Sequence, residues 1–117
     1  MIENELDKLK TLEDNWNSYD SPKPSEHSIE QASEILKFLV YFKLPPERIM
    51  ASSIGGVSLI FKGVDIRRAH IEILNGGQIT TLLYNMEGYS NTLIWEGCTE
   101  MEANNAISSI KNWLLLT

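Results

Sequence analysis

The segment "RRAHIEILNGGQITTLLY", residues 67–84, decides the fold expected for this chain. Two runs of strand-forming residues flank "NGG" at 75–77, where Asn and Gly accept a positive φ at little steric cost. A connection this short forces the two strands to pair in antiparallel fashion. Residues 67–74 and 78–84 are therefore predicted to form a β-hairpin.

Further strand-like runs lie on both sides of this hairpin. They cover residues 57–62 and 92–96, and "RIMASS", which begins at Arg48, opens the series. The breaks between them, such as "IGG" at 54–56 and "MEGYS" at 86–90, are short and rich in turn-forming residues. The expected sheet is a meander of four or five antiparallel strands.

Two helices are predicted before the sheet. Residues 2–13 carry leucines at helical spacing, and this helix is expected to end near Asn15 or Asn17. In the second helix the apolar residues between 29 and 42 form a broad arc. An arc of that width is typical of a helix that packs on a sheet and is also covered at its flank.

The ends of the second helix have their own signals. Ser25 is one candidate for the N-cap, and Ser28 with Gln31 forms a competing capping box. The prolines of "LPPE", residues 44–47, are expected to end the helix.

A last helix follows the sheet, with Thr99 as the predicted N-cap and Glu102 as the returning carboxylate of a capping box. The order of elements indicates an α+β fold. It consists of one antiparallel meander of four or five strands, two N-terminal helices and one C-terminal helix, with the helices packed on one sheet face. Residues 1–117 are expected to form a single domain.

Composition narrows the class of protein. The net charge is −6, acids outnumber bases before and after residue 50, and only Arg67 and Arg68 are adjacent bases. Nucleic-acid binding needs clustered Lys and Arg, so it is not expected. The single cysteine, Cys98, excludes an intramolecular disulfide and favours a reducing compartment. Because there is no secretory signal and no apolar run of membrane-spanning length, we expect a cytoplasmic protein with no membrane partner.

Sequence motifs for catalysis or metal binding are missing. The chain contains no CxxC, HExxH or acidic calcium loop, and His27 lies far from His70 in the sequence. No metal ion and no cofactor are therefore expected. A nucleophile pair of Cys98 with His70 has no supporting sequence context.

The strand at 67–74 has two different sides, because successive side chains of a strand point to opposite faces. The apolar set is Ala69, Ile71 and Ile73. Burial of that set against the helices turns Arg68, His70 and Glu72 toward solvent or a partner, with Tyr84 as the expected aromatic neighbour. A solvated sheet face is the plain interpretation. A docking surface is the alternative, because interfaces favour Tyr, Trp and Arg.

The connection "LEDNWNSYDSPKPSE", residues 12–26, contains two aromatic residues, Trp16 and Tyr19, each of which could be exposed or packed on the core. Trp16 continues the leucine spacing of the first helix, so its ring is expected to pack inward and to clip the loop to the core. A binding site built on Trp16 and Tyr19 is the competing interpretation.

The same stretch carries a resemblance. "LEDNWNSYDSPKPSEHSIEQASEIL", residues 12–36, resembles a segment of small uncharacterised bacterial proteins, which have a helix, a Trp–Asn/Asp–x–Tyr connection, a proline and a second helix. Those proteins continue into a sheet with a Gly-Gly turn, which "SIGGVSLIF" at 53–61 resembles. They often have glycines on both sides of the Tyr, where this chain has Ser18 and Asp20. The resemblance implies no activity and no catalytic residue.

Two function classes follow. The first is a small acidic module that binds another protein, of bacterial or phage type, with a neutralising role as an antitoxin, an immunity protein or an inhibitor of a defence system. A homodimer is also compatible with the sequence. The second is a small enzyme or ligand-binding protein whose site lies between sheet and helices.

The even spread of acidic residues predicts that the chain does not bind nucleic acids. In a mobility-shift assay at low salt, micromolar protein should retain neither DNA nor RNA, because no cluster of bases is present to displace counterions. Tight retention that falls steeply with added salt would contradict this expectation.

Overall fold

The computed structural model describes residues 2–85 and 88–115. It confirms the α+β fold, with three helices and five strands. The elements are α1 (Ile2–Leu9), α2 (Glu26–Tyr41), β1 (Arg48–Ala51), β2 (Gly56–Lys62), β3 (Arg68–Leu74), β4 (Ile79–Asn85), β5 (Gly88–Ile94) and α3 (Glu100–Leu114).

The five strands form one antiparallel sheet in the order β1-β2-β3-β4-β5, which is the predicted meander. In the central hairpin Ile73 pairs with Ile79, and Leu74 N–H donates to the carbonyl oxygen of Gln78 at 2.9 Å. Within the turn Gly77 takes the positive φ, at 97°, because a three-residue hairpin loop needs one left-handed residue.

The last strand was misplaced by the sequence pattern. It covers residues 88–94 and not 92–96, because pairing with β4 extends it through a bulge into the Gly- and Ser-containing segment that predicts a turn. Residues 86 and 87 of that predicted turn lie outside the described part of the chain.

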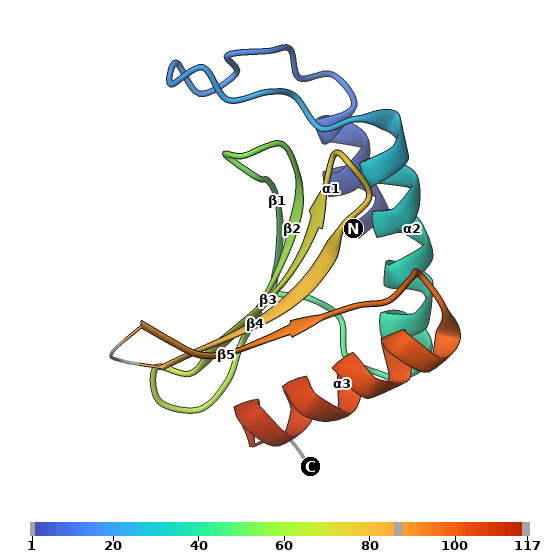
Figure 1. Ribbon diagram of the computed structural model, residues 1–117, viewed down its shortest axis with the longest axis vertical. Coiled ribbons are helices and arrows are strands. Elements are labelled where there is room, and N and C mark those ends of the chain that lie inside the picture. The colour runs from blue at the N-terminus through green and yellow to red at the C-terminus, as the bar shows by residue number, and fades with distance from the viewer. Residues whose placement is uncertain (1, 86–87, 116–117) are drawn as a thin grey trace.

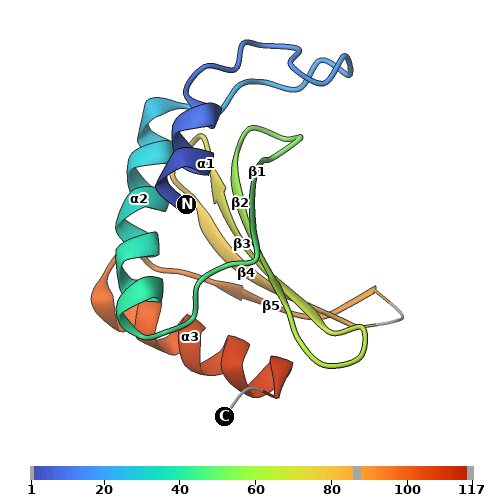
Figure 2. The same cartoon turned by 180° about the vertical axis from the view of Figure 1, so that it is seen from behind.

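All three helices cover the same face of the sheet, as Figures 1 and 2 show from opposite sides. α2 packs on β2 and β3, α3 packs on β3 and β4, and α1 lies against β1. The flank of α2 contacts α1 and α3, as its broad apolar arc predicts, although Val40 at the edge of that arc is exposed.

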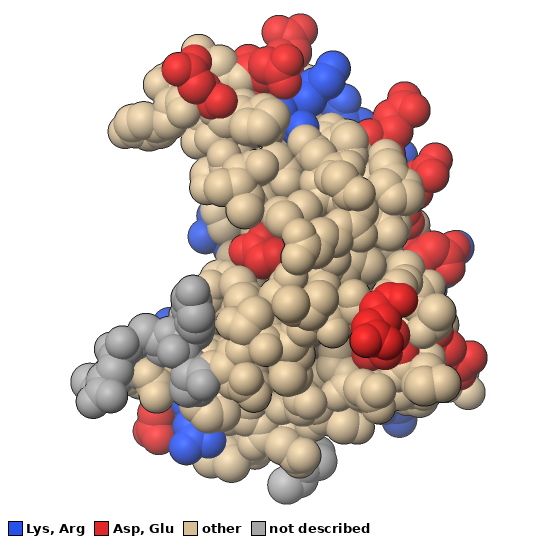
Figure 3. Space-filling view, in the orientation of Figure 1, with Lys and Arg blue, Asp and Glu red and all other residues tan. Residues whose placement is uncertain are grey.

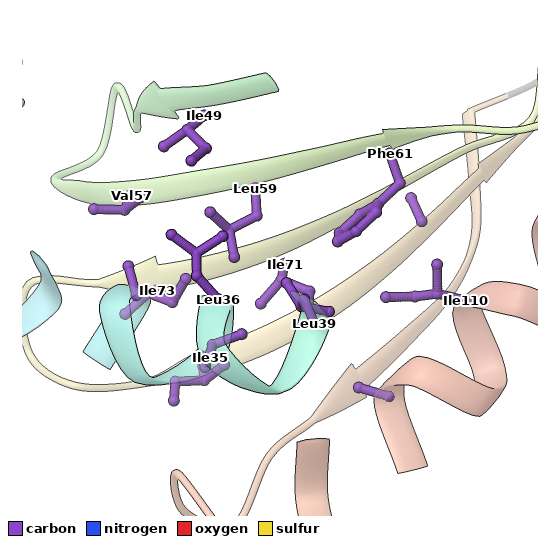
Figure 4. Packing of buried hydrophobic residues seen from close by; sticks show 14 of the residues in the cluster. Ile35, Leu36, Leu39, Ile49, Val57, Leu59, Phe61, Ile71, Ile73 and Ile110 are labelled. Atoms are coloured by element: carbon purple, nitrogen blue, oxygen red, sulfur yellow. The ribbon is translucent and has the colours of Figure 1, made fainter. Parts of the chain in front are cut away.

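The core lies between this face and the helices. Figure 4 shows aliphatic side chains of α2 and α3 directed at those of the strands. The largest fully buried side chains of the core are those of Ile35, Leu39, Leu59, Phe61, Ile71, Ile73, Ile110 and Leu114. Ala69, Ile71 and Ile73 are buried as predicted, so the alternation of β3 fixes which face of the sheet the helices cover.

The first helix is shorter than its sequence pattern predicts. It ends at Leu9, before the expected end near Asn15 or Asn17. The N–H groups of Lys10 and Thr11 donate to carbonyls three residues back, which tightens the last turn. The hydroxyl of Thr11 also donates to Lys8 O at 2.8 Å. A side chain therefore occupies a carbonyl that would accept a backbone N–H if the helix continued.

Ser25 is the N-cap of α2, and its hydroxyl accepts from Ser28 N–H at 3.0 Å. At the other end Lys43 adopts a left-handed conformation with φ of 60°, and Leu44 N–H returns to Leu39 O. The helix therefore stops through a C-terminal left-handed residue before the prolines are reached.

Thr99 is the N-cap of α3, as predicted, and its hydroxyl accepts from Glu102 N–H at 3.2 Å. The carboxylate of Glu102 differs from the expectation, since it accepts from Glu96 N–H at 3.1 Å. It therefore holds the loop that leads from the sheet into the helix.

Asn75, in the β3–β4 turn, joins segments far away in the sequence. Its Oδ1 accepts from Ser25 N–H at 2.7 Å and from the Ser28 hydroxyl at 3.2 Å. Its Nδ2 donates to Lys23 O at 2.9 Å. One carboxamide thus ties the central hairpin to the start of α2 and to the loop before it.

We expect Asn75→Ala to lower the free energy of unfolding by about 2–3 kcal/mol, because it leaves partly buried partners without a hydrogen bond. Asn75→Asp keeps the oxygen that Ser25 and Ser28 use and should cost less. Urea unfolding of the two variants measures the difference. Equal stability of Asn75→Ala and the parent chain would contradict the linking role.

Candidate functional site

The face of the sheet that carries no helix is the candidate site, and we call it the open face. It consists of the outward side chains Arg48, Met50, Ser58, Ile60, Lys62, Arg68, His70, Glu72, Leu74, Thr80, Leu82, Tyr84, Thr92 and Ile94. Figure 1 shows that the sheet is concave on this side and that the loop between α1 and α2 projects past its upper end. In the space-filling view of Figure 3 the molecule is hollowed below that loop.

The structure brings the four residues predicted from strand alternation together on this face. Tyr84 lies opposite Arg68 in the register, and its ring contacts His70 with centroids 4.7 Å apart and planes tilted by 54°. His70 Nδ1 lies 3.8 Å from a carboxylate oxygen of Glu72. The other oxygen of Glu72 accepts a hydrogen bond from the Ser58 hydroxyl on β2. Neighbouring side chains therefore hold the central residues in defined positions.

The backbone beneath this group is anchored from the helix side. Trp113 of α3 donates its indole N–H to the carbonyl oxygens of Arg68 and Tyr84, both at 3.0 Å. The guanidinium of Arg67 lies over the Trp113 ring, 5.0 Å from its centroid. The ends of β3 and β4 that carry the site are thereby fixed to α3.

The arrangement of Ser58, Glu72 and His70 does not suit nucleophilic catalysis. A nucleophile triad places the imidazole between the hydroxyl and the carboxylate, so that it can take the hydroxyl proton. Here the carboxylate lies between the other two, and Ser58 is buried. These contacts orient the three side chains and do not place a base beside the hydroxyl.

Cys98 and His70 are not brought together as a nucleophile pair. Cys98 packs against the core on the helix side, whereas His70 lies on the open face. Burial, and then the negative charge of Glu34, raise the pKa of the Cys98 thiol. The thiolate, which is the nucleophilic form, is therefore disfavoured at neutral pH.

In the loop, Trp16 packs against the core as predicted, and its indole N–H donates to Pro22 O at 3.1 Å. The loop is held by its own contacts as well, since Asn15 N–H donates to Ser21 O at 2.8 Å. Tyr19 has the opposite environment, because 85% of its surface is exposed. The two aromatics therefore divide the roles that the sequence left open: Trp16 clips the loop, and Tyr19 is presented to solvent.

The residues on both sides of Tyr19 have left-handed backbone conformations. Ser18 has a φ of 66° and Asp20 a φ of 61°. At both positions the backbone takes a conformation that glycine favours. Asn15 Oδ1 and Asn17 Oδ1 accept from Asp20 N–H and Tyr19 N–H, so side-chain amides stabilise the tight turn.

Exposed apolar side chains occupy the segments around the open face, which the sequence did not indicate. They are Tyr19 in the projecting loop, Ile54 in the β1–β2 turn, Val64 and Ile66 in the β2–β3 turn, and Ile94 at the end of β5. We call them the apolar rim. They come from four segments that are separate in the sequence, and the curvature of the sheet places these segments around one surface.

A second concavity lies on the helix side, between α1, the loop and the start of α2. Its volume is about 640 Å³, and its lining includes Leu6, Lys10, Pro24 and Ile29. Lys10 is paired with Asp7 at 3.1 Å within α1. The space between sheet and helices, where a ligand site was the alternative expectation, is occupied by the buried aliphatic cluster among the described residues.

Among residues 2–85 and 88–115, no three His, Cys, Asp or Glu side chains stand close enough together to bind a metal ion. None of the helices in that part of the chain combines the length and the apolar character that crossing a membrane requires.

A scan against protein-family models found no match, and searches of curated proteins and of solved structures found no protein similar to this chain. The resemblance to small bacterial proteins therefore stays a prediction, and function is inferred from the geometry described above.

The two roles of the loop aromatics predict different mutant behaviour. Trp16→Ala should lower the free energy of unfolding by about 2–4 kcal/mol, because it removes ring packing against the core and the bond to Pro22. Tyr19→Ala should change it by no more than about 0.5 kcal/mol. Thermal unfolding of both variants tests this, and a reversed order would place Tyr19 in the structural role.

Proposed function

We propose that this chain is a protein-binding module and that the open face is its docking site. One observation carries the proposal: a concave sheet surface that carries Arg68, His70 and Tyr84 on the inner strands β3 and β4 is bordered by the apolar rim. Interfaces favour Arg and aromatic residues at their centre, and exposed apolar side chains gather where a partner binds. The rigid sheet lowers the entropy cost of docking, since these side chains are already ordered by their neighbours.

The charges of the open face indicate the chemistry of the partner. Arg48, Lys62 and Arg68 supply positive charge, although the chain as a whole carries −6. Lys62 is paired with Glu47 at 3.1 Å, and Glu72 already contacts Ser58 and His70. The partner surface that fits is therefore apolar or aromatic at its centre, with carboxylates placed to meet the two arginines.

We further propose a neutralising role in a bacterium or phage, in which the module covers a functional surface of its partner as an antitoxin, an immunity protein or an inhibitor of a defence system does. The small size and the acidic net charge of the chain support this role. A reducing compartment such as the cytoplasm suits the chain, because its one cysteine cannot form an intramolecular disulfide.

The open face is tested with two matched variants. The first, Arg68→Ala/His70→Ala/Tyr84→Ala, removes its centre. The control, Val40→Ala/Tyr41→Ala, removes exposed apolar area from α2 on the opposite side of the molecule. A partner isolated with the parent chain should bind the control with unchanged affinity and the open-face variant at least 30-fold more weakly, about 2 kcal/mol, if Arg and Tyr are central anchors.

Circular dichroism must show that both variants are folded before their affinities are compared. Arg48→Glu/Arg68→Glu should weaken the same complex, because it places carboxylates opposite carboxylates. A folded open-face variant that binds as tightly as the parent chain would exclude this face as the docking site.

A further inference from the structure

Among the described residues, no strand pairs with the outer edge of β5, the last strand of the sheet. Trp95 N–H donates to Ile79 O at 3.0 Å, so the backbone polar groups of Trp95 face β4. Because these groups alternate in direction along a strand, those of Thr92 and Ile94 face away from the sheet. Both residues are exposed, and 65% of the surface of Ile94 is accessible. Among the described elements, β5 packs mainly against β4.

The opposite edge of the sheet is closed in a different way. Ser52 N–H donates to Gly56 O at 2.9 Å, so the outward-facing residues of β1 are Ile49 and Ala51. Both are buried, and α1 packs against this strand. One edge is therefore covered by the chain itself, whereas the other is left available.

The sequence of β5 lacks the features that usually keep an edge strand from pairing. "GYSNTLI", residues 88–94, contains no charged residue and no proline. A bulge near Leu83 and Tyr84 interrupts the start of its pairing with β4 and leaves residues 91–94 in regular register. β5 lies toward the viewer in Figure 1, and Figure 3 shows few charged side chains near the centre of that side.

We propose that β5 pairs with β5 of a second copy of this chain. In the antiparallel register centred on Leu93, Thr92 of each copy faces Ile94 of the other, and their outward N–H and C=O groups form four hydrogen bonds. Within one chain, Thr92 N–H donates a hydrogen bond to Asn91 Oδ1 at 2.9 Å. In the dimer it donates instead to the carbonyl oxygen of Ile94 in the second copy. The two Leu93 side chains meet on the helix side of the joined sheet.

Charge does not prevent a second copy from pairing at this edge. Residues 88–94 contain no charged side chain, so the pairing strands add no contact between like charges, although each chain carries −6. The two-fold pairing also makes the edge complementary to itself without further contacts. Registers that differ by one residue are excluded, because they would place the outward backbone groups of Thr92 opposite Leu93, whose own groups face β4.

This contact is small, so the dimer is expected to be reversible. Four paired residues bury less than a standard interface of about 1,600 Å². The dimer should be populated at roughly 100 µM chain and should dissociate on dilution to about 1 µM. It joins two sheets into one and leaves both open faces accessible on the same side.

A charge exchange on purified chain tests the pairing without any partner protein. Thr92→Lys/Ile94→Lys places two lysine pairs directly opposite each other, and Thr92→Glu/Ile94→Glu does the same with glutamates. In sedimentation velocity each variant alone should be monomeric at 100 µM, and an equal mixture should form a heterodimer. Ile54→Lys changes an isoleucine of similar exposure in the β1–β2 turn and should dimerise as the parent chain does.

The register is tested by cross-linking in a Cys98→Ser background. Leu93→Cys should form an intermolecular disulfide under mild oxidation, since a non-hydrogen-bonded pair brings the Cα atoms to about 4.5 Å. Ile54→Cys should remain uncross-linked. A parent chain that stays monomeric at every concentration, a dimer that survives the lysine variant, or equal cross-linking at both positions would overturn the proposal.

Discussion

The carboxamide of Asn75 is the contact on which the arrangement of the molecule depends. It belongs to the turn of the central hairpin, and it binds the N-cap of α2 fifty positions earlier in the chain. The same side chain holds the end of the projecting loop through Lys23 O. One group therefore positions both the start of the helix and the end of the loop against the sheet. Loss of this contact would leave the loop held by the packing of Trp16 on the core and by its own internal bonds.

The two faces of the sheet have different surroundings, and the residues of β3 alternate between them. Ala69, Ile71 and Ile73 are fully buried, so the helices are confined to their side. The alternate residues gain order from one another, as the ring contact of His70 with Tyr84 shows. A face that is ordered but not covered is suited to recognition, since little conformational entropy remains to be lost on binding.

The two edges of the sheet differ in the same manner. Burial of Ile49 and Ala51 closes the first edge, while exposure of Thr92 and Ile94 leaves the last edge available for hydrogen bonds. The proposed docking site uses side chains of the open face, whereas the proposed self-pairing uses backbone groups of the β5 edge. Thr92 and Ile94 belong to both, because their side chains lie on the open face and their backbone groups at the edge.

Local patterns in the sequence determined those features of the structure that depend only on residues close together in the chain. Alternation along 67–74 fixed the buried face and placed Arg68, His70 and Glu72 on the open one, and Thr99 could be identified as a cap from its neighbours. The tertiary structure decided the rest. The end of α1, the left-handed stop at Lys43 and the start of β5 depend on which distant segments supply hydrogen bonds and packing. The apolar rim likewise comes from turns that are separate in sequence, and only the curvature of the sheet, a property of all five strands together, brings them around one surface.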